Sequence, residues 1–281
     1  MSITGGAKFF QPSLCLSANG ATAVASNGSS SAIYCLDLNP YTYFYTVGSS
    51  DASTETLTIS FNGNQTISRL LLLDHNFKQF GIKYLNGSGS YVDFTNVVGL
   101  DATIGTISET VFSDSSAYYE FDAVSTSGIQ VTVSKTQVAN ADKYLAGLIA
   151  TTEIGTLAGY PTITPIIPDR NSKVAKTLSG KVAVQKSDES TSFMLQFKTY
   201  PSSVAYNVDI DLMMTLNDQD APFLAWLCGG RRGSTYFNYT LRGFRLKDVY
   251  QMHIKSALNL QYTANVTKNS LNCQVDMAES I

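Results

Sequence analysis

Charged side chains are scarce in this chain: Asp, Glu, Lys and Arg make up 15% of its 281 residues, against roughly 25% in ordinary globular domains. The net charge is −3, so a general nucleic-acid binder, which needs a strongly basic surface, is not expected. Hydrophobic residues make up 44%, too many for a disordered chain. The composition therefore predicts a folded protein that makes its contacts mainly through uncharged groups.

Residues that carry acid–base or metal chemistry are also few. The chain has two histidines, His75 and His253, and neither accompanies the Gly-x-Ser-x-Gly motif of a serine hydrolase. The four cysteines are spread along the chain, at Cys15, Cys35, Cys228 and Cys273. None has Cys-x-x-Cys spacing, so neither a metal site nor a disulfide framework is predicted.

Paired carboxylates are the remaining candidates for catalysis. Asp209 with Asp211, and Asp218 with Asp220, are close in sequence, whereas a glycosidase needs two carboxylates that face each other at a set separation. Both pairs are better explained as the ends of a predicted helix, where acidic residues in the first turn are stabilising. We therefore expect no enzyme, no catalytic residue, no metal and no cofactor.

Long apolar runs and a leader sequence are lacking as well. No stretch approaches the roughly 18 apolar residues of a membrane helix, and the run of four leucines at 70–73 has the length of a strand. The N-terminal sequence Met-Ser-Ile-Thr-Gly-Gly has neither the basic nor the apolar segment of a secretory signal. We expect a protein that is made in a cytoplasm and does not bind membranes.

The residues that are abundant are typical of β-structure. The chain has 16 Tyr and 14 Phe, and it is rich in Thr, which favours strands, and in Ser and Gly, which favour turns. Residues 55–61 and 80–84 alternate polar and apolar side chains, which predicts half-buried strands. Turn signals follow them at 62–64 and 86–89. The predicted fold is mostly β: an N-terminal jelly-roll β-sandwich followed by a second β-rich domain with one helix.

Changes in composition divide the chain into four segments. Small polar residues at 18–31 favour an extended segment, and three prolines within 160–169 favour an extended connector. A short helix is expected at 139–148, and a second one from the capping residue Asn207 to Leu216. The predicted segments are an extended arm or loop-rich N-terminus at 1–40, a β-sandwich at 41–138, the helix and Pro-rich connector at 139–170, and a β-rich assembly domain at 171–281.

A series of short motifs in the first half resembles a known fold. The motifs are Thr-Ile-Ser-Phe at 58–61, Ile-Ser-Arg-Leu-Leu-Leu-Leu-Asp-His-Asn-Phe at 67–77, and Phe-Gly-Ile-Lys-Tyr at 80–84. Together they resemble the galactose-binding-like (discoidin, coagulation-factor C) jelly roll, and Ser-Gly-Ile-Gln-Val-Thr-Val at 127–133 sits where that family has its final strand. The disulfide of many secreted members is absent. The resemblance implies a β-sandwich whose end loops can bind glycans or proteins.

Motifs in the second half resemble another class. Phe-Leu-Ala-Trp-Leu-Cys-Gly-Gly at 223–230 and Gly-Phe-Arg-Leu-Lys-Asp-Val-Tyr-Gln-Met at 243–252 look like parts of structural proteins from tailed-bacteriophage virions. Tail-tip, baseplate and neck components are the nearest comparison. The resemblance implies a protein that assembles with other virion proteins.

Positive charge gathers in the second half of the chain. Residues 1–150 carry 6 Lys and Arg against 11 Asp and Glu, net −5, and residues 151–281 carry 13 against 11, net +2. Basic residues between 231 and 247 alternate with aromatic ones, a composition typical of protein interfaces. Solvated strand faces and nucleic-acid contact are the other interpretations. The predicted subunit interface consists of Arg231, Arg232, Tyr236, Tyr239, Arg242 and Arg245.

The leading functional hypothesis is a structural component of a tailed-phage particle that assembles through its C-terminal domain into a symmetric oligomer. Its expected partners are other copies of itself and other virion proteins, and its expected location is the virion. The alternative is a carbohydrate-binding module or adhesin that recognises host surface glycans. The candidate ligand-binding residues for that alternative are Tyr41, Tyr43, Tyr45, His75 and Asn76.

Overall fold

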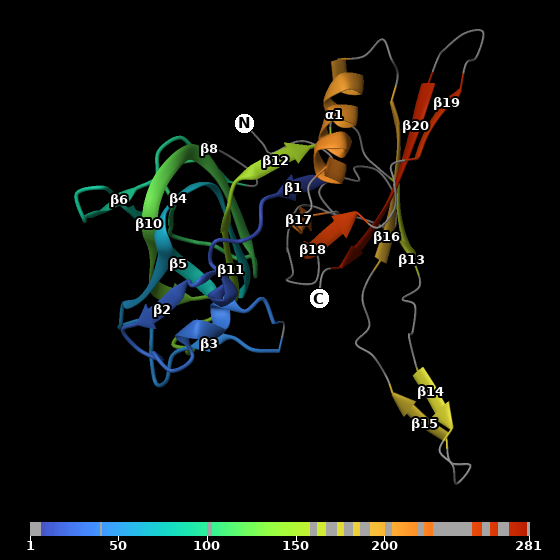
Figure 1. Ribbon diagram of the computed structural model, residues 1–281. Coiled ribbons are helices and arrows are strands. Elements are labelled where there is room, and N and C mark those ends of the chain that lie inside the picture. The colour runs from blue at the N-terminus through green and yellow to red at the C-terminus, as the bar shows by residue number, and fades with distance from the viewer. Residues whose placement is uncertain are drawn as a thin grey trace.

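The computed structural model describes the first half of the chain nearly completely, as residues 7–39, 41–99 and 103–157. In the second half it describes residues 162–166, 173–176, 182–185, 192–199, 204–218, 222–226, 249–254, 259–263 and 270–279. The described part consists of β-strands with one α-helix, α1 (Val204–Asp218) (Figure 1). The predicted mostly β fold is confirmed, and α1 includes the helix expected at 207–216. No helix among these residues is long and apolar enough to cross a membrane.

The first half forms a ten-stranded antiparallel sheet. Its strands are β2 (Thr22–Ala25), β3 (Phe44–Tyr45), β4 (Glu55–His75), β5 (Phe77–Leu85), β6 (Tyr91–Asp93), β7 (Val97–Gly99), β8 (Thr103–Gly105), β9 (Ser108–Glu109), β10 (Ala117–Thr136) and β11 (Tyr144–Thr151). The main path is β3-β11-β4-β10-β5-β6. Two short 3-10 helices, η1 (Ser17–Asn19) and η2 (Ala32–Leu36), lie in the segment before β3.

Bends in the two long strands fold this sheet into two layers. The first part of β4 pairs with β2, and its second part pairs with β11. β10 shifts its register against β4 between Glu120 and Val124 and again between Thr126 and Gly128. The turn expected at 62–64 is therefore a bend within one continuous strand, and the positive φ of Gly63 (79°) lies in it.

The main hydrophobic core lies between the two layers. Leu57 and Ile59 face it from the first part of β4, and Leu70 and Leu72 face it from the second part. All four are buried. The period-two pattern at 55–61 therefore predicted the inward face correctly.

The four leucines at 70–73 are buried on both faces of their strand. Leu70 and Leu72 belong to the sandwich core, whereas Leu71 and Leu73 pack in a second cluster with Phe10 and Trp226. A strand covered on both sides has no solvent-facing positions, so its apolar residues are consecutive. The uninterrupted run in the sequence is the mark of this double burial.

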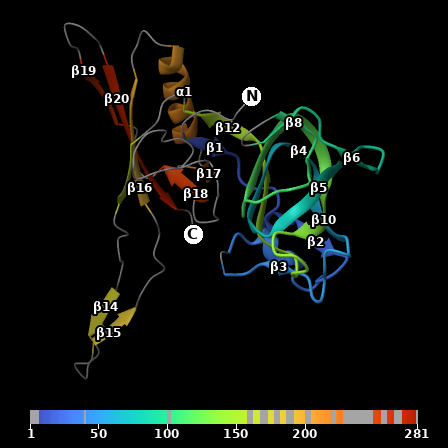
Figure 2. The same ribbon diagram turned by 180° about the vertical axis from the view of Figure 1, so that it is seen from behind.

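The element that covers the outer face is a second, eight-stranded sheet. Its strands are β1 (Lys8–Phe10), β12 (Glu153–Thr156), β13 (Thr162–Ile166), β16 (Ser192–Thr199), β17 (Phe223–Trp226), β18 (Val249–Ile254), β19 (Asn259–Thr263) and β20 (Ser270–Glu279). β1 lies between β12 and β17 and pairs antiparallel with both. A separate hairpin of β14 (Lys173–Lys176) and β15 (Val182–Gln185) projects away from the body of the molecule in both views (Figures 1 and 2).

Helix α1 packs against the second sheet. Leu212, Met213 and Leu216 form a cluster with Phe9 of β1 and Phe223 of β17. Because Phe10 and Trp226 face the sandwich instead, β1 and β17 lie between the sandwich and the helix. The described elements thus stack as two sandwich layers, a part of the second sheet, and α1.

Two expectations about segments are corrected. Of the segment predicted as an extended arm or loop-rich N-terminus, residues 7–39 do not form an extended arm, because they supply β1 to the second sheet and β2 to the sandwich. The helix expected at 139–148 is a loop followed by β11, which pairs with β4. β11 is buried along most of its length, and a short, continuously apolar strand has no period that distinguishes it from a buried helix.

A group of charged side chains lies where the two sheets meet. Lys8 Nζ donates to Glu120 Oε1 (3.2 Å) and Thr156 Oγ1 (3.1 Å), and Arg69 Nη2 lies 2.7 Å from Glu153 Oε2. Burial alone would raise the pKa of Glu153, but its charged and hydrogen-bonded neighbours, Lys8 first among them, hold it below its usual value. These contacts join β1 and β12 of one sheet to β4 and β10 of the other.

Candidate functional site

Three tyrosine rings meet at the edge of the sandwich. Phe44 of β3 is buried, so Tyr43 and Tyr45 on either side of it point outward. Tyr45 lies directly opposite Tyr144 in the pairing of β3 with β11. The ring centroid of Tyr43 is 5.8 Å from that of Tyr45 and 6.0 Å from that of Tyr144, both in edge-to-face geometry. We call Tyr43, Tyr45 and Tyr144 the tyrosine platform.

The platform is open to solvent. Tyr43 is 49% exposed, Tyr45 44% and Tyr144 39%, and Tyr41 in the preceding loop is 88% exposed. Clustered exposed aromatic side chains mark a binding surface more often than isolated ones do. The structure thus brings together two of the predicted residues, Tyr43 and Tyr45. It adds Tyr144, which the sequence analysis missed because it expected a helix there.

Hydrogen bonds hold the backbone of β3 in place. Ser31 Oγ donates to the carbonyl of Tyr45 (2.9 Å) and accepts from its N–H (3.1 Å). The side-chain amide of Asn27 bonds both the N–H and the carbonyl of Val47. An edge strand of two residues is therefore fixed from its outer side, and the rings it carries are positioned before any ligand arrives.

Asn76 fixes the third ring from inside. Its Nδ2 donates to the carbonyl of Asp142 (2.7 Å), and its Oδ1 accepts from the N–H of Tyr144 (3.0 Å). With 8% exposure, Asn76 is too buried to contact a ligand. It was predicted as a ligand-binding residue, and the structure corrects this: it positions Tyr144.

His75 is a core residue. It is fully buried among Phe77, Phe80 and Phe112, with its ring stacked 5.4 Å from that of Phe112. Its Nδ1 accepts from the N–H of Phe77, and its Nε2 has no partner in the described residues. Burial lowers the pKa of His75 to about 3. The predicted ligand contact is therefore corrected, because this ring is neutral and faces away from solvent.

A polar network supports the loops next to the platform. The side chain of Lys143 is buried, and its Nζ donates to the carbonyl of Ser50 (2.8 Å). Asp142 Oδ1 accepts from the N–H of Ser49 (2.8 Å). Hydrogen bonds from the backbone N–H of Thr136 lower the pKa of Asp51 in the same loop. These bonds tie residues 46–51 to residues 136–143, so the surroundings of Tyr144 are held at several points.

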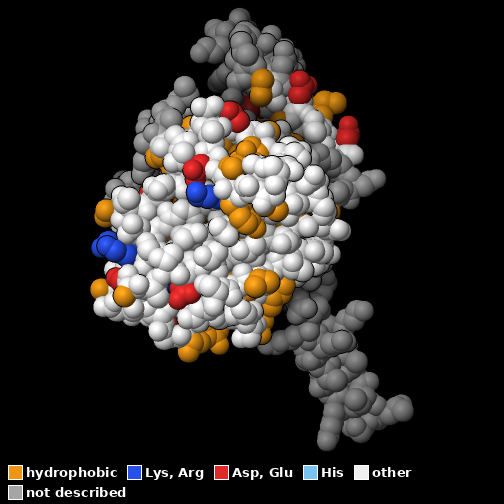
Figure 3. All heavy atoms as spheres, turned by 90° about the vertical axis from the view of Figure 1, so that its left-hand side faces the viewer, with side chains coloured by type: hydrophobic (Ala, Val, Ile, Leu, Met, Phe, Trp, Pro, Cys, Tyr) orange, Lys and Arg blue, Asp and Glu red, His pale blue; other side chains and the backbone are white. Residues whose placement is uncertain are grey.

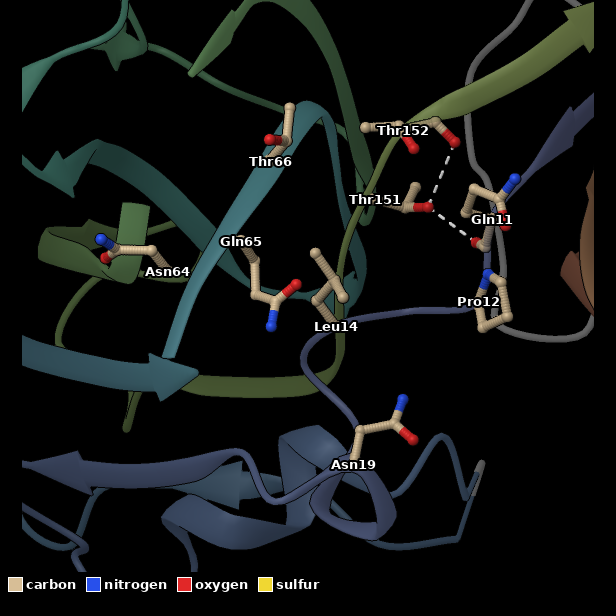
Figure 4. A pocket seen from close by; sticks show the side chains of 9 residues that line it. All are labelled: Gln11, Pro12, Leu14, Asn19, Asn64, Gln65, Thr66, Thr151 and Thr152. Carbon is tan, nitrogen blue, oxygen red and sulfur yellow. Dashed lines mark hydrogen bonds between the residues drawn. The ribbon is translucent and has the colours of Figure 1, made fainter. Parts of the chain in front are cut away.

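A pocket of about 510 Å³ lies at the other end of β11 (Figure 4). It is lined by uncharged residues, among them Gln11, Leu14, Asn19, Gln65 and Thr151. They come from three parts of the chain that no sequence motif connects, so the sequence analysis gave no signal for this pocket.

The face of the molecule that includes the sandwich carries few charged side chains. Figure 3 shows a surface dominated by uncharged polar groups, with several separate hydrophobic patches and few charged side chains. Among the described residues, no group of three or more His, Cys, Asp and Glu is placed to hold a metal ion. The surface therefore offers hydrogen bonds and apolar contacts more than ionic ones.

The predicted subunit interface falls outside the described residues. This applies to all six of its members: Arg231, Arg232, Tyr236, Tyr239, Arg242 and Arg245. Assembly into a symmetric oligomer and membership of a phage particle therefore stay predictions.

Carbohydrate-binding modules are among the solved structures to which the chain is similar. One is chitosan-binding module 1 of a chitosanase/glucanase from Paenibacillus sp. IK-5, at 15% identity and a TM-score of 0.40, covering 50% of this chain and 98% of that one. Another is the family 32 module of C. perfringens NanJ in complex with galactose, at 16% identity and a TM-score of 0.39, covering 52% and 98%. A third is chitosan-binding module 2 of the Paenibacillus enzyme in complex with chitotriose, at 21% identity and a TM-score of 0.38, covering 49% and 98%.

No family model matches the chain, and no curated protein does. The functional argument therefore depends on the side chains described above.

Proposed function

We propose that the chain binds neutral carbohydrates through the tyrosine platform. The observation that carries the proposal is the arrangement of three exposed rings, in which Tyr43 contacts both Tyr45 and Tyr144. Ser31 and Asn76 fix the backbone that carries them. Binding without a chemical step is what we propose for this site.

The chemistry of a sugar ring matches such a surface. One face of many pyranose rings carries mainly C–H groups, which pack on aromatic rings, while the hydroxyls around its rim need hydrogen-bond partners. Tyrosine supplies both, since its ring is apolar and its hydroxyl donates and accepts. The three rings carry no charge, and few charged side chains lie on the face that Figure 3 shows. A neutral ligand is therefore favoured, because little charge has to lose its hydration on binding.

A protein partner is the competing explanation, because tyrosine is also enriched at protein interfaces. The size of the platform argues against it. A fully buried aromatic side chain covers roughly 150–250 Å², so three rings that are each less than half exposed offer a few hundred Å² at most. A stable protein interface needs about 800 Å² per partner.

Affinity electrophoresis tests the proposal. The protein is run on native gels that contain neutral polysaccharides, such as galactans and glucans, or acidic ones as a comparison. We expect a neutral polysaccharide to retard the wild type, and the double variant Tyr43→Ala/Tyr144→Ala to lose at least about tenfold in affinity, which is about 1.4 kcal/mol. Tyr91→Ala is the control, because Tyr91 lies on β6, at a distance from β3 (Figure 1).

The proposal is wrong if no polysaccharide retards the wild type. It is also wrong if the double variant is retarded as strongly as the wild type and the control.

A further inference from the structure

The pocket at the far end of β11 is built by hydrogen bonds within the protein. The segment after β1 runs beside the end of β11, with the N–H of Gln11 bonded to the carbonyl of Thr152 and the N–H of Leu14 bonded to that of Ala150 (both 2.9 Å). Thr151 Oγ1 also donates to the carbonyl of Gln11 (2.7 Å) (Figure 4). This wall therefore exists in the unbound protein and does not have to form around a ligand.

The opposite side of the pocket comes from η1 and from the bend of β4. Asn19 Nδ2 donates to the carbonyl of Ser13 (2.8 Å), and Gln65 Nε2 donates to the carbonyl of Asn62 (3.0 Å). Each amide group is thus held in one orientation. Their side-chain oxygens have no hydrogen-bond partner among the described residues, and Figure 4 shows both side chains extending toward the space beside Leu14.

The backbone after Asn19 depends on a glycine. Gly20 has a φ of +82°, and an added Cβ would lie 3.3 Å from Nδ2 of Asn62. A side chain at this position would be strained and crowded against the bend of β4. Gly20 therefore allows the chain after η1 to lie close to Asn62 in the bend of β4.

The lining selects for a neutral, hydroxyl-rich ligand. No charged side chain lines the pocket; its polar groups are amides and hydroxyls, and Pro12 and Leu14 add an apolar wall. Arg69, which pairs with Thr151 in the β4–β11 register, is already bound to Glu153 (2.7 Å), so it does not offer a free cation to an anionic ligand. The volume of about 510 Å³ falls within the roughly 300–1,000 Å³ of ligand pockets.

We propose that this pocket is a second binding site, which holds one neutral sugar unit between Gln65, Asn19 and Leu14. It goes beyond the function proposed for the tyrosine platform and does not depend on it. Tyr144 begins β11 and Thr151 ends it, so the two sites are about 24 Å apart at roughly 3.4 Å per residue. A substitution in one site should leave the other unchanged.

Side-chain amide resonances provide a direct test. Methyl glycosides of galactose and glucose are titrated into ¹⁵N-labelled protein up to about 50 mM, enough to saturate a site with a Kd near 1 mM. We expect saturable shifts of the side-chain amides of Gln65 and Asn19 with at least one neutral glycoside, and none for Asn86, a half-buried residue in the turn between β5 and β6. Glucuronate and glucosamine serve as charged probes.

Variants separate this site from the platform. Gln65→Ala should abolish the shift of Asn19, and Thr152→Ala should weaken it at least threefold, while Tyr144→Ala should leave it as in the wild type. Both pocket variants change side chains at the surface, and far-UV circular dichroism checks that they are folded.

Four results would overturn the second site. The first is that no neutral glycoside shifts the amides of the folded protein. The second is that only a charged probe shifts them, and the third is that the shift of Asn19 persists unchanged in Gln65→Ala. Loss of the shift in Tyr144→Ala would show that the pocket is not independent, which also contradicts the proposal. If the platform variants bind polysaccharide as strongly as the wild type in affinity electrophoresis, the platform proposal is wrong and the pocket proposal is unaffected.

Discussion

At the scale of single residues, His75 and Asn76 are adjacent in the sequence but have different structural roles. Both were predicted to contact a ligand, since polar residues at a strand end often do. In the structure His75 turns into the core among three phenylalanines, and Asn76 bonds the backbone of Asp142 and Tyr144. Both are too buried to contact a ligand, and Asn76 acts on the platform through Tyr144.

His75 should make the stability of the fold sensitive to acid. Its pKa falls from the usual 6.5 to about 3 on folding, so the unfolded chain takes up a proton below pH 6.5 that the folded chain refuses. Stability is therefore lost as the pH falls from about 6.5 toward 3, by about 1.4 kcal/mol per pH unit. His75→Asn keeps an acceptor near the position of Nδ1 but does not titrate. The free energy of unfolding is measured with urea at a series of pH values between about 3 and 6.5. Plotted against pH, it should have a slope that is flatter in His75→Asn than in the wild type by about 1.4 kcal/mol per pH unit.

Equal slopes in the wild type and in His75→Asn would mean that the imidazole is not held neutral by the fold.

Asn76→Ala should weaken both stability and binding. It leaves the carbonyl of Asp142 and the N–H of Tyr144 without their partner, at a cost of about 1–3 kcal/mol. It also frees the start of β11, so glycan affinity should fall at least about threefold. Asn86→Ala is the control, because Asn86 accepts hydrogen bonds in a remote turn. Thermal unfolding and affinity electrophoresis measure the two effects, and a variant that binds like the wild type would show that Asn76 does not position the ring.

The residues of the platform were predictable only in part. Tyr43 and Tyr45 stand out as aromatic residues two apart in extended chain at the start of β3, where alternation places them on one face. Tyr144 does not stand out, because only the pairing of β3 with β11 brings it opposite Tyr45. Contacts between distant segments carry no local signal.

At the scale of elements, the second half of β4 is the central feature. Its leucines alternate between two cores: Leu70 and Leu72 face the sandwich interior, and Leu71 and Leu73 face β1 and β17. The sequence predicted a strand here, and an apolar run without alternation was the signal that both of its faces are covered. It could not show what covers the outer face, because β1 and β17 are far away along the chain.

Leu71→Ala and Leu70→Ala should both destabilise the protein by about 2–5 kcal/mol, but with different signatures. Trp226, the only tryptophan of the chain, shares a cluster with Leu71 and not with Leu70. The fluorescence emission of folded Leu71→Ala should shift to the red as its surroundings loosen, and that of folded Leu70→Ala should not. The same emission maximum in both variants would contradict the two-core description.

At the scale of the whole molecule, the sandwich and the second sheet share an apolar cluster and a charged one. β1 comes from the N-terminus, yet it lies between β12 and β17, so the two sheets are tied by the chain itself (Figure 2). The sequence predicted two β-rich parts and an extended arm or loop-rich N-terminus. It could not predict that this segment supplies β1 to the second sheet, because the partners of β1 are more than a hundred residues away.

Glu153→Gln tests the charged cluster between the sheets. It breaks the half-buried pair with Arg69, and the cost should lie between the roughly 1 kcal/mol of an exposed pair and the roughly 3 kcal/mol of a fully buried one. Asp93→Asn breaks the exposed pair of Lys83 and Asp93 (3.6 Å) and should cost less than about 1 kcal/mol. The pKa of Glu153 is lowered on folding, so its contribution is present above the usual glutamate pKa and is lost as the pH falls below it. Chemical unfolding at neutral and acidic pH measures both effects, and equal losses in the two variants would contradict this role.

The scarcity of charge noted in the sequence has a counterpart on the surface. The platform and the pocket are both made of rings, amides and hydroxyls, and few charges are visible on the sandwich side (Figure 3). Such a surface suits ligands that are themselves neutral and rich in hydroxyls. The same composition agrees with the prediction of an assembling particle protein, which the described residues leave as a prediction.

The most direct test of the central claim is isothermal titration of a neutral oligosaccharide, cut from the polysaccharide that binds best, into single tyrosine variants. We predict that Tyr43→Ala and Tyr144→Ala each lower the affinity at least about tenfold, or about 1.4 kcal/mol, and that Tyr91→Ala stays within about twofold of the wild type. Wild-type affinity in folded Tyr43→Ala and Tyr144→Ala would contradict the claim that the tyrosine platform binds the sugar.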